Sequence, residues 1–320
     1  MKKLGIILLL VILAAVIIIV VIGDFRSTRL DNRPENKYEL DIGDYKTVDP
    51  SLIDYKETRN YTIRADSVEG IAYSQQKIYV VADRFLQVFN PEGNQVLKVN
   101  MPGPPTCVDI TTDDSIIVGF KDHIGLFSGN GEQIWLSDTI NSRSVITAVA
   151  GKNPLIFVAD AGNRVVHRYD MSGKYLDSFE GKTGQEDLHG FIIPSPYFDL
   201  KINDVGELWV VNTGKHAFEN YTDEGELRSF WENNSVRVDG FSGCCNPAHF
   251  TFLSDGSFVT SEKKIVRIKV HKPSGEFLSV VAPPEKFKEE GKAPDVAADE
   301  EGNVYALDYD RKIIRVFTPK

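Results

Sequence analysis

The 320-residue sequence lacks the local motifs of several large enzyme classes and the charge pattern of nucleic-acid-binding proteins. It contains no Walker loop, no Gly-x-Gly-x-x-Gly loop after a strand, no Gly-x-Ser-x-Gly elbow and no His-Glu-x-x-His helix. Its formal net charge is −10, and no basic stripe is interleaved with aromatic residues. Because phosphate binding requires clustered Lys and Arg, we expect no nucleic-acid partner.

Long apolar runs are equally scarce, and the one that stands out is at the N-terminus. Lys2 and Lys3 precede the run from Leu4 to Ile22, which has no charged residue. As a helix this run is about 28 Å long, close to the thickness of a hydrocarbon core. No small-residue cleavage site is evident after it, and no cysteine follows to take a lipid. We therefore predict an uncleaved transmembrane signal anchor over residues 1–23.

The remainder of the chain is expected outside the cytoplasm, in a periplasm or at the cell surface. The two lysines favour an inside N-terminus, and long C-terminal domains are translocated largely regardless of the basic residues that follow the span. Residues 24–55 are polar and poorly periodic, which predicts a stalk or linker between the membrane and a domain over residues 56–320.

Beyond residue 56 the chain repeats itself. One unit reads "VEGIAYSQQKIYVVADRFLQVFNPEGN" and another reads "ITAVAGKNPLIFVADAGNRVVHRYDMSGK". Each has short alternating runs separated by Asp/Asn-x-x-Gly turns, the pattern of antiparallel strands and hairpins. The turn glycines are spaced 38, 42, 52 and 50 residues apart. A period near forty residues predicts a β-propeller, and we count six blades, starting near Val68, Cys107, Ile146, Tyr197, Ala248 and Asp295.

The ends of the repeat region predict how the ring closes. The sixth unit stops after its third strand, "IIRVFTPK", and an unassigned strand precedes the first unit, from Glu57 to Ala65. If the early strand completes the last blade, the ring has no open inner edge. The fold class expected is therefore all-β, a six-bladed propeller preceded by one transmembrane helix.

At this point the chain resembles the NHL-type six-bladed propellers. The matching stretches are "VADAGNRVVHRYDMSGK" from Val158 and "PDVAADEEGNVYALD" from Pro294. The resemblance covers about 265 residues, nearly the whole predicted domain. It implies a fold and not an activity, because this architecture serves binding modules, lyases and hydrolases alike.

The first strand of each blade is expected to line the central channel. Equivalent positions in the six blades form a ring at the channel mouth: Glu69, Cys107, Thr147, Asp199, His249 and Asp295. Like charges in a confined site raise one another's pKa unless something compensates them, and a cation such as Ca²⁺, Mn²⁺ or Zn²⁺ is one compensation. The alternative is that Asp199 and Asp295 cap turns and that Glu69 faces a wet channel.

Part of this ring is similar to the gluconolactonase-type propellers. "VEGIA" around Glu69 resembles their opening Glu-Gly motif, and "PDVAADEEGN" around Asp295 resembles their Pro-Asp-Gly segment. The resemblance implies a divalent metal in the channel and hydrolysis of lactones or related esters. The channel asparagines of those enzymes have no counterpart here unless Asn246 supplies one.

Two of the three cysteines are adjacent, in "FSGCCNPAHF" from Phe241 to Phe250. Three interpretations remain open for Cys244 and Cys245. They form a vicinal disulfide that makes an apolar platform beside a ligand, together with Asn246. They bind copper or zinc with His249, although two or three ligands do not make a full shell. Or they are small buried thiols in a tight turn.

These observations favour a membrane-anchored binding module at the cell envelope. Its partner would be another envelope protein or a small ligand, bound at the channel mouth and the loops after Gly181 and before His249. A metal-dependent lactone or ester hydrolase that uses the channel is the competing class. A redox protein that cycles the cysteine pair between dithiol and disulfide is the third.

Overall fold

The computed structural model describes residues 5, 12–21, 43–182 and 190–320, in two units divided between Ile42 and Gly43. In the first unit, residues 12–21 are helical, and the rest of the predicted membrane span and the stalk up to residue 42 lie almost wholly outside the described residues. Among the residues that are described, no helix is long and apolar enough to cross a membrane. The membrane anchor therefore remains a prediction.

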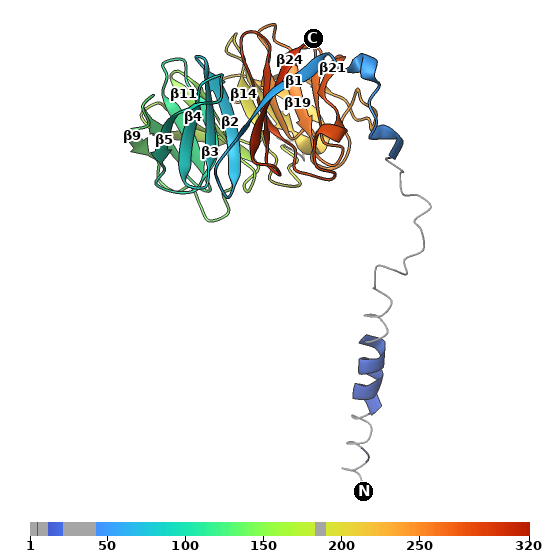
Figure 1. Ribbon diagram of the computed structural model, residues 1–320. Coiled ribbons are helices and arrows are strands. Elements are labelled where there is room, and N and C mark those ends of the chain that lie inside the picture. The colour runs from blue at the N-terminus through green and yellow to red at the C-terminus, as the bar shows by residue number, and fades with distance from the viewer. Residues whose placement is uncertain (1–4, 6–11, 22–42, 183–189) are drawn as a thin grey trace. The chain divides into compact units, whose positions relative to one another are not determined.

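The second unit is a six-bladed β-propeller, as the repeat predicted (Figure 1). Its described residues form six four-stranded antiparallel sheets, and in five of them the strands follow one another in chain order. We number the blades by their innermost strand along the chain. Blade one is therefore the blade whose innermost strand comes first in the chain.

The strands occupy four positions in each blade. The innermost strands are β2 (Val68–Ser74), β6 (Pro105–Ile110), β10 (Ile146–Lys152), β14 (Leu200–Ile202), β18 (His249–Phe252) and β22 (Asp295–Ala298). The second strands are β3 (Lys77–Ala82), β7 (Ile116–Phe120), β11 (Leu155–Asp160), β15 (Leu208–Asn212), β19 (Phe258–Glu262) and β23 (Val304–Asp308). The third strands are β4 (Phe85–Phe89), β8 (Ile124–Phe127), β12 (Val165–Asp170), β16 (Ala217–Tyr221), β20 (Arg267–His271) and β24 (Ile313–Pro319). The outer strands are β5 (Gln95–Asn100), β9 (Gln133–Leu136), β13 (Tyr175–Phe179), β17 (Leu227–Glu232), β21 (Phe277–Ala282) and β1 (Tyr55–Thr62). Short 3₁₀ helices lie at η2 (Gly43–Tyr45), η3 (Pro50–Leu52), η4 (Thr213–Lys215) and η5 (Pro284–Lys286).

The ring closes through strand β1, which is the outer strand of blade six. It pairs antiparallel with β24, from Tyr55 opposite Pro319 to Thr62 opposite Ile313. Figure 1 shows the blue strand β1 beside the red end of the chain. Closure by the strand ahead of blade one is thus confirmed. The folded unit also begins earlier than residue 56, because Ile53 already bridges Val280 of blade five.

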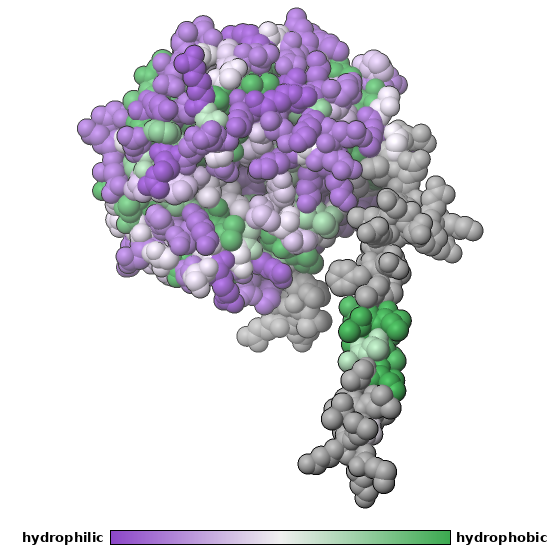
Figure 2. Space-filling model, turned by 60° about the horizontal axis from the view of Figure 1, so that its bottom comes forward, coloured by the Kyte–Doolittle hydropathy of each residue, from purple (hydrophilic) through white to green (hydrophobic). Residues whose placement is uncertain are grey.

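The core is divided among the six boundaries between neighbouring blades. Along β3, Ile78 and Val80 pack into the cluster shared with blade six, whereas Tyr79 and Val81 pack into the cluster shared with blade two. Successive side chains of a strand point to opposite faces, and both faces of each blade are covered. This explains why the strands are nearly continuous apolar runs such as "IYVVA". Figure 2 shows the contrasting exterior, a propeller face dominated by hydrophilic residues.

The five glycines that set the repeat spacing share one backbone conformation. Each has φ between 82° and 86°, in the left-handed region that favours glycine. Each also packs against a side chain on the outer strand of the preceding blade. For example, a Cβ added at Gly275 would lie only 2.7 Å from the ring of Trp231. The glycines concerned are Gly93, Gly131, Gly173, Gly225 and Gly275.

Candidate functional site

The six residues predicted to form a ring do line one cavity at the centre of the propeller. The cavity is small, about 20 Å³, which suits a single ion or water rather than an organic molecule. Val108, Ala148, Val149 and Lys201 complete its wall, and the ring residues are Glu69, Cys107, Thr147, Asp199, His249 and Asp295.

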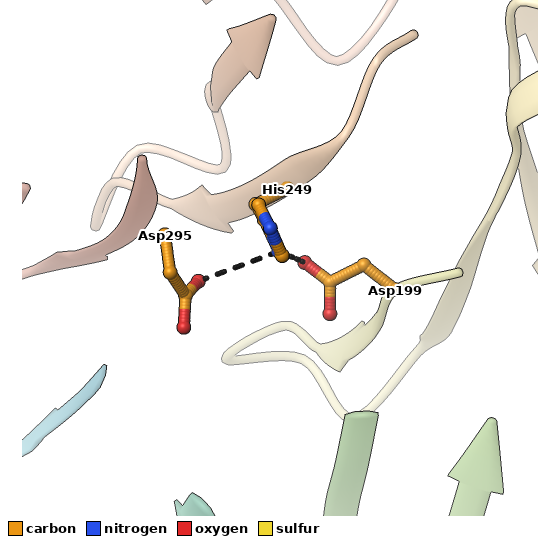
Figure 3. A group of neighbouring side chains, drawn as sticks. All are labelled: Asp199, His249 and Asp295. Atoms are coloured by element: carbon orange, nitrogen blue, oxygen red, sulfur yellow. Dashed lines mark ion pairs between the residues drawn. The ribbon is translucent and has the colours of Figure 1, made fainter. Parts of the chain in front are cut away.

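Three of the six residues form a close cluster, shown in Figure 3. His249 begins β18, Asp295 begins β22, and Asp199 directly precedes β14. His249 Nδ1 lies 3.8 Å from Asp199 Oδ2 and 3.8 Å from Asp295 Oδ1. One potential ligand atom from each residue lies within 4.8 Å of the others. Among the described residues Glu69 lines the same cavity but does not belong to this cluster.

The two carboxylates of the cluster also connect neighbouring blades. Asp199 accepts hydrogen bonds from the backbone N–H of Leu200 in its own blade and of Phe250 in blade five, at 2.9 and 3.0 Å. Asp295 accepts one from Ile71 of blade one at 2.9 Å.

A third carboxylate makes the same kind of connection. Asp109 of blade two accepts from the Gly151 N–H of blade three at 3.1 Å. Blades two, four and six therefore each reach the next blade. These contacts between blades differ from the turn caps of the alternative interpretation, and they hold the carboxylates in place.

Burial and mutual charge shift the protonation equilibria of the cluster. Burial alone would lower the pKa of His249, but the adjacent Asp199 and the charge of Asp295 raise it above its ordinary value of 6.5. Burial raises the pKa of Asp295, although His249 and Lys201 oppose that rise. The raised pKa means that His249 keeps its proton to a higher pH than a free imidazole does. A metal ion that binds here must displace the proton of His249.

A lysine that was not predicted from the sequence, Lys201, lies in the same channel. Lys201 lines the small cavity and also a larger one of about 470 Å³. Burial tends to lower the pKa of its ammonium group, yet the charges of Asp109, Asp199 and Asp295 raise it. Lys201 follows Asp199 by two residues, and Asp109 follows Cys107 by two. Strand alternation places both on the channel side, a signal that was available in the sequence.

The larger cavity opens between the ends of the inner strands and the hairpins that follow them. Its polar wall includes Asp109, Lys152, Lys201, Asn203 and Thr251. No sequence feature had indicated it. The residues of β6, β10 and β18 that line this cavity come later in their strands than the ring residues do. The larger cavity and the Asp199–His249–Asp295 cluster therefore lie on opposite sides of Lys201.

Two tyrosines flank His249 at the ring mouth. The ring of Tyr197 meets the imidazole edge-on with centroids 5.5 Å apart, and the ring of Tyr309 lies 6.2 Å away. Each tyrosine carries a lysine ammonium over its face, Lys263 at 5.2 Å and Lys292 at 5.5 Å. Burial raises the pKa of the Tyr309 hydroxyl well above its ordinary value, so that it remains a hydrogen-bond donor.

The adjacent cysteines lie in the loop that enters blade five, and both are free thiols. Cys244 is exposed, Cys245 is buried, and their Sγ atoms are 3.2 Å apart. Cys107, in the wall of the central cavity, is buried, and burial raises the pKa of its thiol to about 12.

The side chain of Asn246 is hydrogen-bonded to backbone groups. Its side chain donates to the carbonyls of Ser242 and Lys263 and accepts from the Lys263 N–H. It therefore holds the loop in place and is not the missing channel asparagine.

Comparisons with known proteins bear on the fold. The chain matches no protein-family model and no curated protein sequence. Among solved structures it is similar to a streptogramin B lyase, with a TM-score of 0.61 and 12% identity over 85% of this chain and 100% of that one. It is also similar to the virginiamycin B lyase of Staphylococcus aureus, with a TM-score of 0.59 and 15% identity over 83% of this chain and 100% of that one. A protein of unknown function from Bacteroides thetaiotaomicron gives a TM-score of 0.61 and 15% identity over 83% of this chain and 72% of its own. At these identities the likeness establishes a shared propeller fold and does not identify the NHL family.

Proposed function

We propose that the protein is a binding module whose channel mouth holds a divalent cation and, through it, a small anionic ligand. The observation that carries this proposal is the Asp199–His249–Asp295 cluster. Two carboxylate oxygens and one imidazole nitrogen, all within 4.8 Å of one another, make a donor set that suits Mn²⁺, Zn²⁺ or Ca²⁺. Three protein ligands leave coordination positions open.

The surroundings of the cluster support an anionic ligand in those open positions. Lys263 and Lys292 bring two positive charges to the rim, each over a tyrosine face. Tyr197 and Tyr309 offer partly exposed rings beside His249, on which a flat or apolar part of the ligand can rest. The cavity below the ring is too small for an organic group. The ligand would therefore lie at the mouth, above the cation.

Cation binding is tested by calorimetry and native mass spectrometry of the full chain with Mn²⁺, Zn²⁺ and Ca²⁺. We expect one ion per chain and an affinity that increases with pH, because the ion displaces the His249 proton. His249→Gln and Asp295→Asn should each weaken binding by tenfold or more, on the order of 1.4 kcal/mol.

Asp109→Asn is the matched control. Asp109 braces blades two and three as Asp295 braces blades six and one, but it lies outside the cluster. It should therefore leave the affinity nearly unchanged. A protein that binds no ion at any pH, or that loses binding equally in all three variants, would contradict the proposal.

A metal-dependent hydrolase or lyase that uses the same site is the second candidate. It is favoured by the coordination positions that three protein ligands leave open, at which a metal-bound water could be activated, and by the likeness to two lyases. A panel of lactones, esters and streptogramin B compounds should be assayed with the cation-loaded protein. Turnover that His249→Gln abolishes would favour this candidate over simple binding.

We further propose that the propeller is tethered outside the cytoplasm by the N-terminal apolar run. The support is the sequence alone: the run from Leu4 to Ile22 and the two lysines before it. Such a location gives access to another envelope protein as partner. Protease protection in intact cells tests this topology, and cleavage of the propeller only after lysis would overturn it.

A further inference from the structure

The adjacent thiols of Cys244 and Cys245 do not belong to the Asp199–His249–Asp295 cluster, and they differ sharply in accessibility. Cys244 is exposed to solvent, whereas Cys245 is only 1% exposed. Their Sγ atoms are 3.2 Å apart, so one sulfur is within reach of an attack by the other. The exposed thiol can therefore react with a reagent, and the buried thiol lies close enough to displace the bound reagent from it.

The loop that carries the thiols is firmly attached to blade five. Buried Lys269 and Arg267 donate hydrogen bonds to the carbonyls of Gly240 and Arg237, at 2.6 and 2.9 Å. On the other side of the thiols, the Asn246 side chain accepts from the Lys263 N–H at 2.9 Å. Because both ends are held, the two sulfurs keep their relative position without a covalent bond.

The surroundings of Cys245 favour its thiolate. Burial opposes ionisation, but the side chains of Ser195, Cys244 and Lys263 outweigh it and lower the pKa of the Cys245 thiol. Ser195 Oγ is a buried hydroxyl that makes no hydrogen bond among the described residues, so its O–H is not engaged elsewhere. Lys263 comes from the hairpin after β19, and its ammonium also lies over Tyr197.

We propose that Cys244 and Cys245 form a redox-active vicinal dithiol that reacts with small-molecule disulfides and closes to an intramolecular disulfide. Cys244 is the attacking thiol, because it is exposed. Cys245 is the resolving thiol, because it is buried against Cys244 and faces Lys263. None of the three cluster residues takes part in this exchange, although Lys263 belongs both to the rim of the cation site and to the surroundings of Cys245.

The exchange proceeds in two balanced steps. In the first, the Cys244 thiolate attacks one sulfur of the small disulfide, a Cys244–sulfur bond forms, the original S–S bond breaks, and one thiol leaves with the proton that Cys244 lost. In the second, the Cys245 thiolate attacks Cys244 Sγ, the intramolecular S–S bond forms, the bond between Cys244 and the small thiol breaks, and the second thiol leaves with the proton that Cys245 lost. In total the protein loses two electrons and two protons, and the small disulfide gains them.

The test treats the reduced full chain with oxidised glutathione, traps it with an alkylating reagent and maps the cysteine peptides by mass. The wild-type protein should close the Cys244–Cys245 bond with only a transient glutathione adduct. Cys245→Ser should stop at a stable adduct on Cys244, and Cys244→Ser should react at least about tenfold more slowly. Cys107 is an internal control and should remain reduced, because its thiol is buried and weakly acidic.

A matched pair of lysine variants separates activation from general effects. Lys263→Met keeps the backbone N–H that binds Asn246 but removes the positive charge that favours the Cys245 thiolate, and should slow the second step by about tenfold. Lys264→Met, at the exposed neighbouring position, should leave that rate unchanged. A stable glutathione adduct on the wild-type protein, the absence of reaction, or equal slowing by both lysine variants would overturn the proposal.

Discussion

At the scale of single residues, small side chains and backbone angles decide how closely neighbouring blades approach. In blades one to five, the glycine of the turn before the outer strand packs against a side chain from the preceding blade. The same glycine has a positive φ, so one position must meet both requirements. Gly275 has a φ of 85°, and Trp231 covers it. A single residue therefore satisfies both the turn and the packing between blades four and five.

We expect Gly275→Ala to destabilise the propeller by about 1–3 kcal/mol. The positive φ is unfavourable for alanine, and its Cβ would lie 2.7 Å from the Trp231 ring, which must shift. Chemical denaturation of the two proteins measures the difference.

Gly256→Ala is the control for the packing contribution. Gly256 has a φ of 81°, but an added Cβ would meet only Pro273 at an ordinary 3.7 Å. Equal losses of stability in the two variants would show that the tryptophan contact contributes nothing.

At the scale of elements, strand β1 is attached to its blade by charge as well as by backbone pairing. Arg315 donates from Nε and Nη2 to the two carboxylate oxygens of Glu57, at 3.0 and 2.9 Å. Lys286 approaches the same carboxylate at 3.4 Å. Because Glu57 belongs to β1 and Arg315 to β24, this two-pronged contact lies on the seam of the ring.

The seam should weaken in acid. Burial tends to raise the pKa of Glu57, but Arg315 and Lys286 lower it below its ordinary value of 4.5. A carboxyl group with a lowered pKa in the folded state stabilises above its unfolded pKa, and this contribution is lost as pH falls through the folded value. Glu57→Gln should therefore cost about 2 kcal/mol at pH 7 and much less at pH 3. Denaturation at both pH values tests this, and a cost that does not change with pH would refute the assignment.

At the scale of the whole molecule, the ring is stable only when all six blade boundaries are buried. Each of the six apolar clusters belongs to two blades, so the loss of one boundary exposes two apolar faces. Strand β1 covers the outer edge of β24 in the last blade, and Tyr55 packs in the cluster between blades five and six.

A chain that starts after Ser67 lacks β1 and should aggregate. The truncation exposes the edge of β24 and removes Tyr55 from its cluster. Light scattering and thermal melting are the measurements, with a chain that starts at Gly43 as the control. A soluble monomer with native-like melting from the shorter chain would reject the closure mechanism.

The sequence by itself determined the architecture, because the architecture depends on local patterns. The spacing of the turn glycines and of the alternating apolar runs gives the length of the repeat. The length of the repeat predicts a propeller and the number of its blades. The same register placed Glu69, Asp199, His249 and Asp295 around one channel, since equivalent positions of equivalent strands converge on the axis.

Only the tertiary structure decided which of these residues meet. Asp199, His249 and Asp295 come from three different blades, and their separation depends on how the blades pack, which no repeat reports. Lys201 follows strand alternation but became relevant only when its charge was found between three carboxylates. The adjacency of Cys244 and Cys245 was visible in the sequence. Their difference in exposure was not, nor was the approach of Ser195 and Lys263, because those contacts join segments that are about 50 and about 20 residues away along the chain.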